Sequence, residues 1–463
     1  MEKSITKRAL SMLLAIALIL CTIPAISLPT FAASESDLTF ELTYDGYSYE
    51  VSDCNENASG ELVIPSEYNG KPVMRIGDEA FKDCKKITSV TIPDSLIIIG
   101  NRAFENCTGL ISITIPNSMT DIYTGVFKNC TGLKKINIPD DAEYIEKTLF
   151  ADTAYYKDES NWENGILYIG NSLIAAKENI ESCVIKNGTK RIASAAFSDC
   201  KNITSITIPD SVTEICDLAF EKCVGLTSIT IPGSVANIGY CAFKGCAGLT
   251  SITIPDSVTN IGYCAFEGCV GLTSITIPSS VLRIGSGAFS YCTSLKEISV
   301  SSRNGNYSSQ DGVLFDDDKS VLIAYPCGKA ENSYTIPDTV YQIAHSAFEG
   351  CVGLTAITIP AGVRRIMDGA FRNCTGLISL TILGSEIDFF DEVFSGCTSI
   401  NEINVPDDAT YMYTGYDGIG SFADTAYYKD ESNWENGILY IGNHLIEVKY
   451  DISGACVIKD GIK

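Results

Sequence analysis

Histidine and tryptophan are scarce in this chain, and the motifs of common catalytic sites are missing. Its 463 residues include two histidines and two tryptophans. His345 falls at a variable position of the repeat described below, and His444 aligns with Ser172 in a duplicated segment. There is no Gly-x-Ser-x-Gly, His-Glu-x-x-His or phosphate-binding glycine loop. We therefore expect a protein that is not an enzyme, without catalytic, cofactor-binding or metal-binding residues.

Basic residues are also few relative to acidic ones. The chain has 33 Lys and Arg against 57 Asp and Glu, a formal net charge of −24. Nucleic acids and anionic membranes are bound through basic patches, so this balance argues against both as partners. The acidic run Asp316–Asp318 lacks the alternating oxygen spacing of a calcium loop, and we expect a hydrated turn there.

Only one hydrophobic run is long, and it lies at the N-terminus. A basic start precedes an apolar stretch over residues 9–26, and small residues then suit cleavage after Ala32. This pattern predicts a signal peptide over residues 1–32 and a secreted or cell-surface protein. An uncleaved membrane anchor is one alternative, and a lipoprotein at Cys21 is another, which the preceding Leu20 disfavours. No later stretch could span a bilayer, so we expect no membrane insertion after cleavage.

A repeat fills most of the remaining sequence. Phe-x-x-Cys occurs eleven times, and the step within each uninterrupted run is 23 residues. The phenylalanines are Phe81, Phe104, Phe127, Phe197, Phe220, Phe243, Phe266, Phe289, Phe348, Phe371 and Phe394. A period of this length is typical of solenoids.

One repeat, residues 249–271, reads LTSITIPDSVTNIGYCAFEGCVG. Its Leu-x-x-Ile-x-Ile start predicts a short strand with one buried face. Pro255 ends the strand because proline has no amide hydrogen for the ladder. We expect Phe266 to plug the interior of the coil from a short helical turn, and Cys269 to close the coil. Stacked coils share a core that one coil cannot form alone.

The pattern Leu-x-x-Ile-x-Ile-Pro-x-x-Val-x-x-Ile-Gly-x-x-Ala-Phe-x-x-Cys resembles the bacterial surface antigen (BspA-type) leucine-rich repeat, over nearly all of the chain after the N-terminal segment. We expect an α/β, mostly β solenoid of ~23-residue coils. One face should carry a parallel sheet, and the other short strands and helical turns. The resemblance implies an extracellular, non-enzymatic protein, and some relatives are similar to adhesins that bind host matrix proteins such as fibronectin and fibrinogen. No binding residues carry over, because the shared residues form the core.

Several segments depart from the regular repeat. Residues 34–75 are expected to form an N-terminal β cap with a turn at Asp45-Gly46, and repeats then occupy residues 76–463. Inserts that we expect to form hairpins lie at about 150–190, 299–341 and 422–463. The last insert stops at Lys463, where its equivalent continues into further repeats. This ending predicts a fragment or a gene truncated in mid-repeat.

The segment ADTAYYKDESNWENGILYIGN occurs twice, at 151–171 and 423–443, and contains both tryptophans. Exposed aromatic side chains anchor protein interfaces and stack on sugar rings. The candidate ligand contacts are therefore Tyr155, Tyr156, Trp162, Tyr427, Tyr428 and Trp434. The alternative, which we favour, is a variant repeat that was copied with its neighbours and whose tryptophan covers apolar surface beside the hairpin.

All but one of the 19 cysteines follow the N-terminal segment, and one per repeat forms a row. Neighbours in this row should lie about 4.8 Å apart. We expect buried thiols that pack as small apolar residues, with disulfide pairing or metal binding as alternatives. Cys241 and Cys264 occupy a tolerant, partly exposed position and are the best candidates for a disulfide. A four-cysteine zinc site that adds Cys246 and Cys269 has a spacing unlike the usual knuckle.

Three functions fit this sequence. The one we expect is binding of an extracellular or host-matrix protein, on the polar face lined by Thr250, Ser251 and Thr253. The second is binding of a carbohydrate or cell-wall glycan through the aromatic inserts. The third is a structural extracellular spacer.

Overall fold

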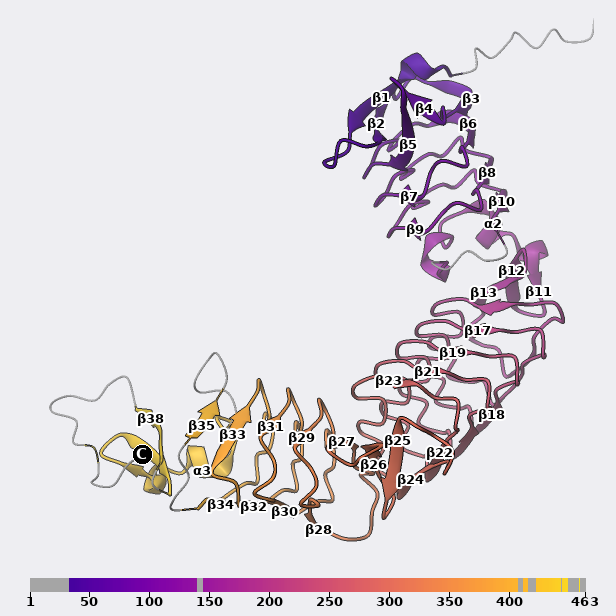
Figure 1. The fold of residues 1–463 in the computed structure, drawn as a ribbon. Helices are drawn as coiled ribbons and strands as arrows, with labels where there is room; N and C mark the ends of the chain where they lie inside the picture. The colour runs from indigo at the N-terminus through magenta and orange to yellow at the C-terminus, as the bar shows by residue number, and fades with distance from the viewer. Residues whose placement is uncertain are drawn as a thin grey trace, which may run out of the picture. The chain divides into compact units, whose positions relative to one another are not determined.

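Figure 1 shows the computed structural model of the chain. It describes residues 33–139, 145–406, 422–442 and 444–448, the backbone of 411–414, and Ile458. The chain divides into two compact units. Unit 1 comprises Met1–Pro139 and Leu149–Lys157, and unit 2 comprises Asp140–Thr148 and Asp158–Lys463. The predicted signal peptide lies outside the described residues, as does most of the chain after Val448.

Unit 1 begins with an antiparallel hairpin and continues as coils whose strands join into one mixed and one parallel sheet. One sheet has the order β1-β2-β5-β7-β9, with β4 paired to β5, and the other has the order β10-β8-β6-β3. The hairpin loop contains Asp45 and Gly46, as the sequence predicts. The elements are η1 (Glu35–Asp37), β1 (Leu38–Leu42), β2 (Tyr49–Cys54), β3 (Ser59–Val63), β4 (Glu67–Tyr68), β5 (Lys71–Ile76), β6 (Lys86–Thr91), β7 (Ile98–Ile99), β8 (Ser112–Thr114), β9 (Asp121–Ile122), β10 (Lys135–Asn137) and α2 (Ala154–Lys157).

The coils of unit 2 carry strands on two faces. On one face, strands of two to five residues join into long sheets with the orders β11-β12-β13-β15-β17-β19-β21-β23 and β25-β26-β27-β29-β31-β33-β35. The members after β13 in the first sheet are β15 (Arg191–Ile192), β17 (Glu214–Ile215), β19 (Asn237–Ile238), β21 (Asn260–Ile261) and β23 (Arg283–Ile284). Those after β27 in the second are β29 (Gln342–Ile343), β31 (Arg365–Ile366), β33 (Glu386–Phe389) and β35 (Tyr411–Thr414). We call this side the short-strand face.

The opposite side carries the Leu-x-x-Ile-x-Ile strands, in the smaller sheets β14-β16, β18-β20, β22-β24 and β28-β30-β32-β34. These strands are β14 (Ser182–Val184), β16 (Ser205–Thr207), β18 (Ser228–Thr230), β20 (Ser251–Thr253), β22 (Ser274–Ile277), β24 (Glu297–Val300), β28 (Ser333–Thr335), β30 (Ala356–Ile359), β32 (Ser379–Ile382) and β34 (Glu402–Asn404). We call this side the Leu-Ile face. Parallel strands therefore occur on both faces, and the longer sheets lie on the face where the sequence predicts only short strands.

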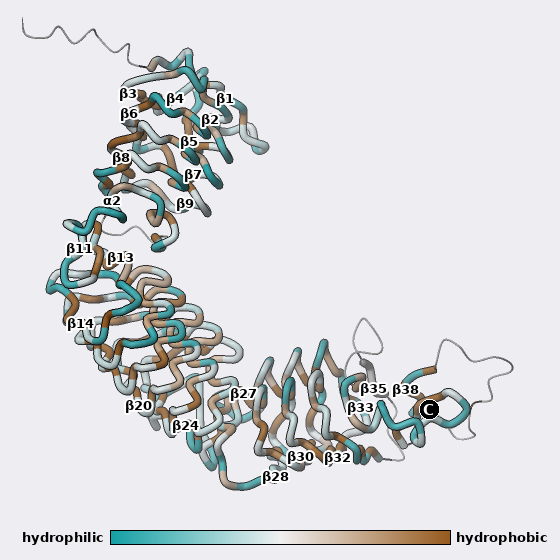
Figure 2. Tube along the Cα trace, turned by 180° about the vertical axis from the view of Figure 1, so that it is seen from behind, coloured by the Kyte–Doolittle hydropathy of each residue, from teal (hydrophilic) through white to brown (hydrophobic). Residues whose placement is uncertain are grey.

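The register of the sheets sets like residues side by side. Ser251 pairs with Ser228 in β20 and β18, and Asn260 pairs with Asn237 in β21 and β19. Each residue thus meets its equivalent one period away, so apolar and polar positions form continuous rows along the stack. Figure 2 shows the result as hydrophobic and hydrophilic segments that alternate within each coil.

Two of these rows form the centre of the core. The rings of Phe243 and Phe266 stack at 5.5 Å, and those of Phe266 and Phe289 at 5.9 Å. The Cys269 thiol donates a hydrogen bond of 3.2 Å to the carbonyl of Phe243 in the preceding coil. All of these side chains are buried, as the sequence predicts for the phenylalanine plug and the cysteine row.

The segment around Ala265-Phe266 forms short hydrogen-bonded turns and not a continuous helix: the Glu267 amide donates to the Cys264 carbonyl at 3.0 Å, and the Cys269 amide to the Phe266 carbonyl at 3.1 Å. The residue two positions before the phenylalanine has a left-handed backbone, with φ of +52° at Cys241 and +54° at Cys264. A right-handed helix cannot pass through such a residue.

Each of the inserts contains an antiparallel hairpin. In the first, the turn at Gly170-Asn171 joins the two strands. The insert elements are η2 (Lys147–Leu149), η3 (Glu159–Asn161), β11 (Trp162–Glu163), β12 (Ile166–Ile169) and β13 (Ser172–Ala176); β25 (Tyr307–Gln310), β26 (Val313–Asp316) and β27 (Val321–Ala324); and α3 (Ala426–Lys429), η4 (Glu431–Asn433), β36 (Trp434–Glu435), β37 (Ile438–Ile441) and β38 (His444–Val448).

Candidate binding groove

A hollow of about 600 Å³ lies on the short-strand face of unit 2, across β17, β19, β21 and β23. Its lining includes the isoleucine of each strand, Ile215, Ile238, Ile261 and Ile284, and the first three of these residues are buried. A glycine follows three of these isoleucines, and at Gly262 an added Cβ would lie 2.5 Å from the carbonyl oxygen of Gly239. Glycine therefore allows the close approach of neighbouring coils that forms this surface.

The rim of the groove carries aromatic and polar side chains at steps of one coil. Tyr240 and Tyr263 are 48% and 61% exposed, and Asn237 and Asn260 repeat at the same interval. Arg283 is exposed beside them and forms no ion pair among the described residues. Such groups can bind a ligand through ring contacts, hydrogen bonds and one fixed positive charge.

The two ends of the groove are held by hydrogen bonds. At one end the Tyr307 hydroxyl accepts from the Ile284 amide at 2.9 Å, and burial raises the pKa of this tyrosine. At the other end Asp217 accepts from the Tyr240 amide at 2.7 Å, and Glu214 forms an ion pair with the buried Arg191. Glu214 is thus paired with a cation, whereas Arg283 is exposed without an ion pair among the described residues and can meet a negative charge of a ligand.

The polar face proposed from the sequence is present on the other side of the coils. Thr250, Ser251 and Thr253 are exposed around the buried Ile252. The groove was not predicted from the sequence, because the Leu-x-x-Ile-x-Ile pattern indicated the Leu-Ile face as the binding surface. The signal that could have revealed it is the recurrence of Asn and Tyr in the consecutive segments NIGY, at 237–240 and 260–263.

The aromatic residues of the duplicated segment make structural contacts in the second copy. The Trp434 indole donates to the carbonyl of Tyr428 at 2.7 Å, and the two rings meet edge to face at 5.3 Å. The Tyr427 hydroxyl donates to the carbonyl of Tyr440 at 2.8 Å. Phe422, just before this copy, stacks on Phe394 at 5.1 Å and continues the phenylalanine row.

The first copy is divided between the two units. In unit 1 the Tyr155 amide donates to the carbonyl of Leu133 at 2.8 Å, while Tyr156 is half-buried. In unit 2 the Lys177 ammonium lies 5.3 Å from the ring centre of Trp162. These contacts favour the structural interpretation, and a ligand-contacting role of the six aromatic residues stays a prediction.

Most cysteines in the described residues are free thiols, but two form a disulfide that the sequence did not reveal. Cys351, a member of the cysteine row, is bonded to Cys327 in an insert. Cys327 does not belong to any Phe-x-x-Cys pair, so the period gave no signal for it. Burial raises the pKa of Cys246 and of Cys292 to about 12, which keeps these row members protonated.

Cys241 and Cys264 are free thiols in the structure, and Cys264 is partly exposed while Cys241 is buried. The expectation of exposure is thus wrong for Cys241. The thiols of Cys246 and Cys269 point into the core, where they donate to backbone carbonyls at 3.0 Å and 3.2 Å. They therefore do not join the other two in a four-cysteine site.

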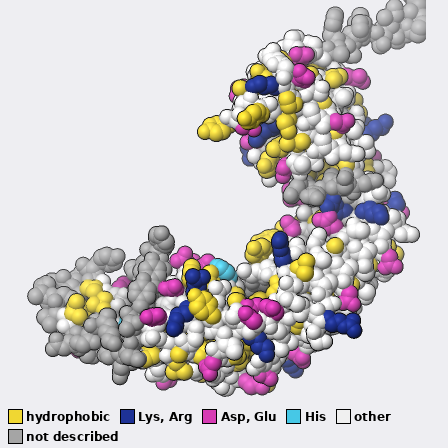
Figure 3. Space-filling model, viewed as in Figure 1, with side chains coloured by type: hydrophobic (Ala, Val, Ile, Leu, Met, Phe, Trp, Pro, Cys, Tyr) yellow, Lys and Arg dark blue, Asp and Glu magenta, His cyan; other side chains and the backbone are white. Residues whose placement is uncertain are grey.

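Charges of both signs are mixed on the face seen in Figure 3, where Lys and Arg side chains are interspersed with Asp and Glu. Among the described residues, no helix is long and apolar enough to cross a membrane.

The stacked coils and the groove define a leucine-rich-repeat solenoid. A family model described as the BspA type leucine-rich repeat region matches residues 62–173, 213–311 and 325–425, in six copies. The chain belongs to this family, as the sequence pattern indicates. No curated protein matches it.

Several solved structures are similar to the chain. A leucine-rich repeat protein from Bacteroides ovatus is 24% identical, with 79% of this chain and 92% of that chain covered and a TM-score of 0.33. A leucine-rich cell surface protein from Faecalibacterium prausnitzii is 24% identical, with 80% and 93% covered and a TM-score of 0.27. The pneumococcal vaccine antigen PcpA is 19% identical, with 82% and 84% covered and a TM-score of 0.30.

Proposed function

We propose that this chain is a secreted or cell-surface, non-catalytic solenoid that binds another protein and acts as an adhesin. The observation that carries the proposal is the groove across β17, β19, β21 and β23. Tyr240, Tyr263 and Arg283 belong to the residue types that dominate the binding energy of protein interfaces. Their regular placement suits an extended segment of a partner that lies across successive coils.

The charges of the groove indicate the chemistry of this segment. Glu214 is paired within the chain, and Arg283 is exposed without an ion pair among the described residues. A partner with a carboxylate opposite Arg283 and apolar or aromatic groups against the two tyrosines would match the surface. The guanidinium can hold a carboxylate through two parallel hydrogen bonds.

The extracellular location rests on two supports. The pattern of residues 1–32 is that of a secretory signal peptide. The similar protein of Faecalibacterium prausnitzii is described as a cell surface protein.

The test is binding of the purified chain, Ala33–Lys463, to an array of matrix proteins, mucins and glycans. For a protein ligand found there, Tyr240→Ala and Tyr263→Ala should each raise the Kd about 30-fold, as expected for interface hot spots. The matched control is Thr230→Ala with Thr253→Ala on the Leu-Ile face, which should leave the Kd unchanged. The reverse pattern would place the ligand on the strands proposed from sequence.

The same array tests the alternatives. Glycan binding that is lost in a folded Trp162→Ala/Trp434→Ala variant would assign the ligand site to the aromatic inserts. Absence of binding to every protein and glycan of the array would favour the structural spacer.

A further inference from the structure

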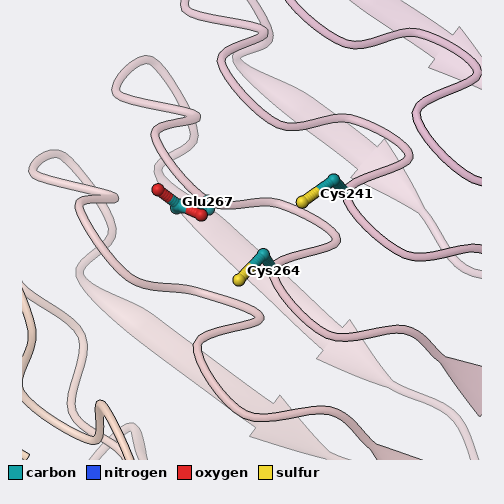
Figure 4. A group of neighbouring side chains, drawn as sticks. All are labelled: Cys241, Cys264 and Glu267. Carbon is teal, nitrogen blue, oxygen red and sulfur yellow. The ribbon is translucent and has the colours of Figure 1, made fainter. Parts of the chain in front are cut away.

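Cys241, Cys264 and Glu267 form a cluster of metal-ligating side chains on two successive coils (Figure 4). One ligand atom of each, the two sulfurs and a carboxylate oxygen, all lie within 4.8 Å of one another. The coil register sets Cys264 beside Cys241. A turn in which the Glu267 amide donates to the Cys264 carbonyl at 3.0 Å then brings the carboxylate back beside the thiols.

We propose that these three side chains bind a thiophilic divalent cation such as Zn²⁺, with three protein ligands and one open position. Zinc binds sulfur at about 2.3 Å and carboxylate oxygen at about 2.0–2.2 Å, so ligand atoms around a tetrahedral ion lie roughly 3.5–3.8 Å apart. Small side-chain rotations would bring the three atoms from their present separations to these distances.

The next coil leaves room beside the cluster. Gly287 follows Cys264 in the same row, and an added Cβ there would lie 3.4 Å from the Cys264 sulfur. The glycine thus keeps a side chain away from one flank of this sulfur. Cys264 and Glu267 are both partly exposed, so a hydrated ion can reach them.

Lys244 is the competitor for this site. Its ammonium lies 2.9 Å from the Glu267 carboxylate, and a bound cation would have to displace it. Removal of this lysine should therefore tighten metal binding, whereas a merely structural cluster would show no such response.

The site adjoins the groove. Tyr240 and Tyr263 immediately precede the two cysteines, and both line the groove. A cation at the cluster would link the two coils that carry these tyrosines. Metal binding is measured without any groove ligand, so its test is independent of the proposed adhesin function.

The experiment is titration of the reduced chain, Ala33–Lys463, with Co²⁺ and Zn²⁺ under oxygen-free conditions. We expect one ion per chain and the sulfur-to-cobalt charge-transfer absorption. Both should disappear in Cys241→Ser/Cys264→Ser and persist in Cys183→Ala, a control that removes a thiol outside the cluster. Circular dichroism of each variant verifies the fold.

Two further variants test the third ligand and its competitor. Glu267→Gln should weaken Zn²⁺ binding by about 10- to 100-fold. Lys244→Met should tighten it by up to roughly fivefold, the equivalent of one exposed ion pair. Binding that persists in the double cysteine variant, or no stoichiometric binding by the folded chain, would overturn the proposal. The proposal would also be overturned if protein isolated under air contained a Cys241–Cys264 disulfide and bound no cobalt after reduction of that disulfide.

Discussion

Replacement of Phe266 by alanine tests how the solenoid is held together. The ring is fully buried between Phe243 and Phe289, and the angles between its plane and the planes of those two rings are only 4° and 2°. A buried Phe→Ala change costs about 3–5 kcal/mol, and each stacked pair adds about 0.5–1.5 kcal/mol beyond area burial. With two stacked partners lost, we expect a cost near the top of the first range, about 5 kcal/mol.

The loss of stability caused by Phe266→Ala should also be local. Repeats contact only their neighbours, so stability is close to a sum over adjacent coils. Hydrogen exchange followed by mass spectrometry should show lost protection in the coils of Phe243, Phe266 and Phe289, and urea unfolding should show the cost. Thr253→Ala, at an exposed position of the same region, should stay within about 0.5 kcal/mol. A cost below about 1 kcal/mol for Phe266→Ala, or equal loss of protection in remote coils, would refute the reasoning.

Three other predictions concern pH, backbone packing and the duplicated segment. The pKa of Cys246 and of Cys292 is raised to about 12 from 9.0, so their contribution to stability is complete below pH 9 and lost as pH rises towards 12. The free energy of unfolding, measured with urea, should be constant from pH 7 to 8.5 and fall above pH 9, by up to about 4 kcal/mol for each of the two thiols near pH 12, and by less in Cys246→Ala. Gly262→Ala should cost about 1–3 kcal/mol by overpacking two coils, whereas Gly233→Ala, where an added Cβ meets nothing within 4 Å, should not. Trp434→Ala should cost about 3 kcal/mol or more in the C-terminal insert, and unchanged exchange protection there would argue against its structural role.

The repeat made the fold predictable, because a 23-residue period with fixed apolar positions allows one arrangement of stacked coils. The buried Phe266 and Cys269 follow directly from this pattern. The left-handed backbone at Cys264 does not follow from the pattern, because cysteine has no local preference for a positive φ.

The groove and the cysteine cluster were harder to predict for a different reason. The sequence paired Cys241 with Cys264 as disulfide candidates, but Asn237 and Tyr240 form a surface only when the next coil places their equivalents beside them. Glu267 joins the two cysteines through a backbone turn, and its spacing from Cys264 alone matches no known metal motif. The disulfide of Cys327 depends on how an insert folds back, which the period cannot describe.

The in-register stacking of near-identical coils has a consequence for how such a protein can change. The segments 226–248 and 249–271 present nearly the same upper and lower surfaces to their neighbours. Duplication or deletion of one such coil by unequal recombination would therefore preserve every interface in the stack. It would add or remove one Asn-Tyr pair from the groove in a single genetic event. The length of the ligand that the groove holds could therefore change by one coil at a time, and each intermediate protein would still fold.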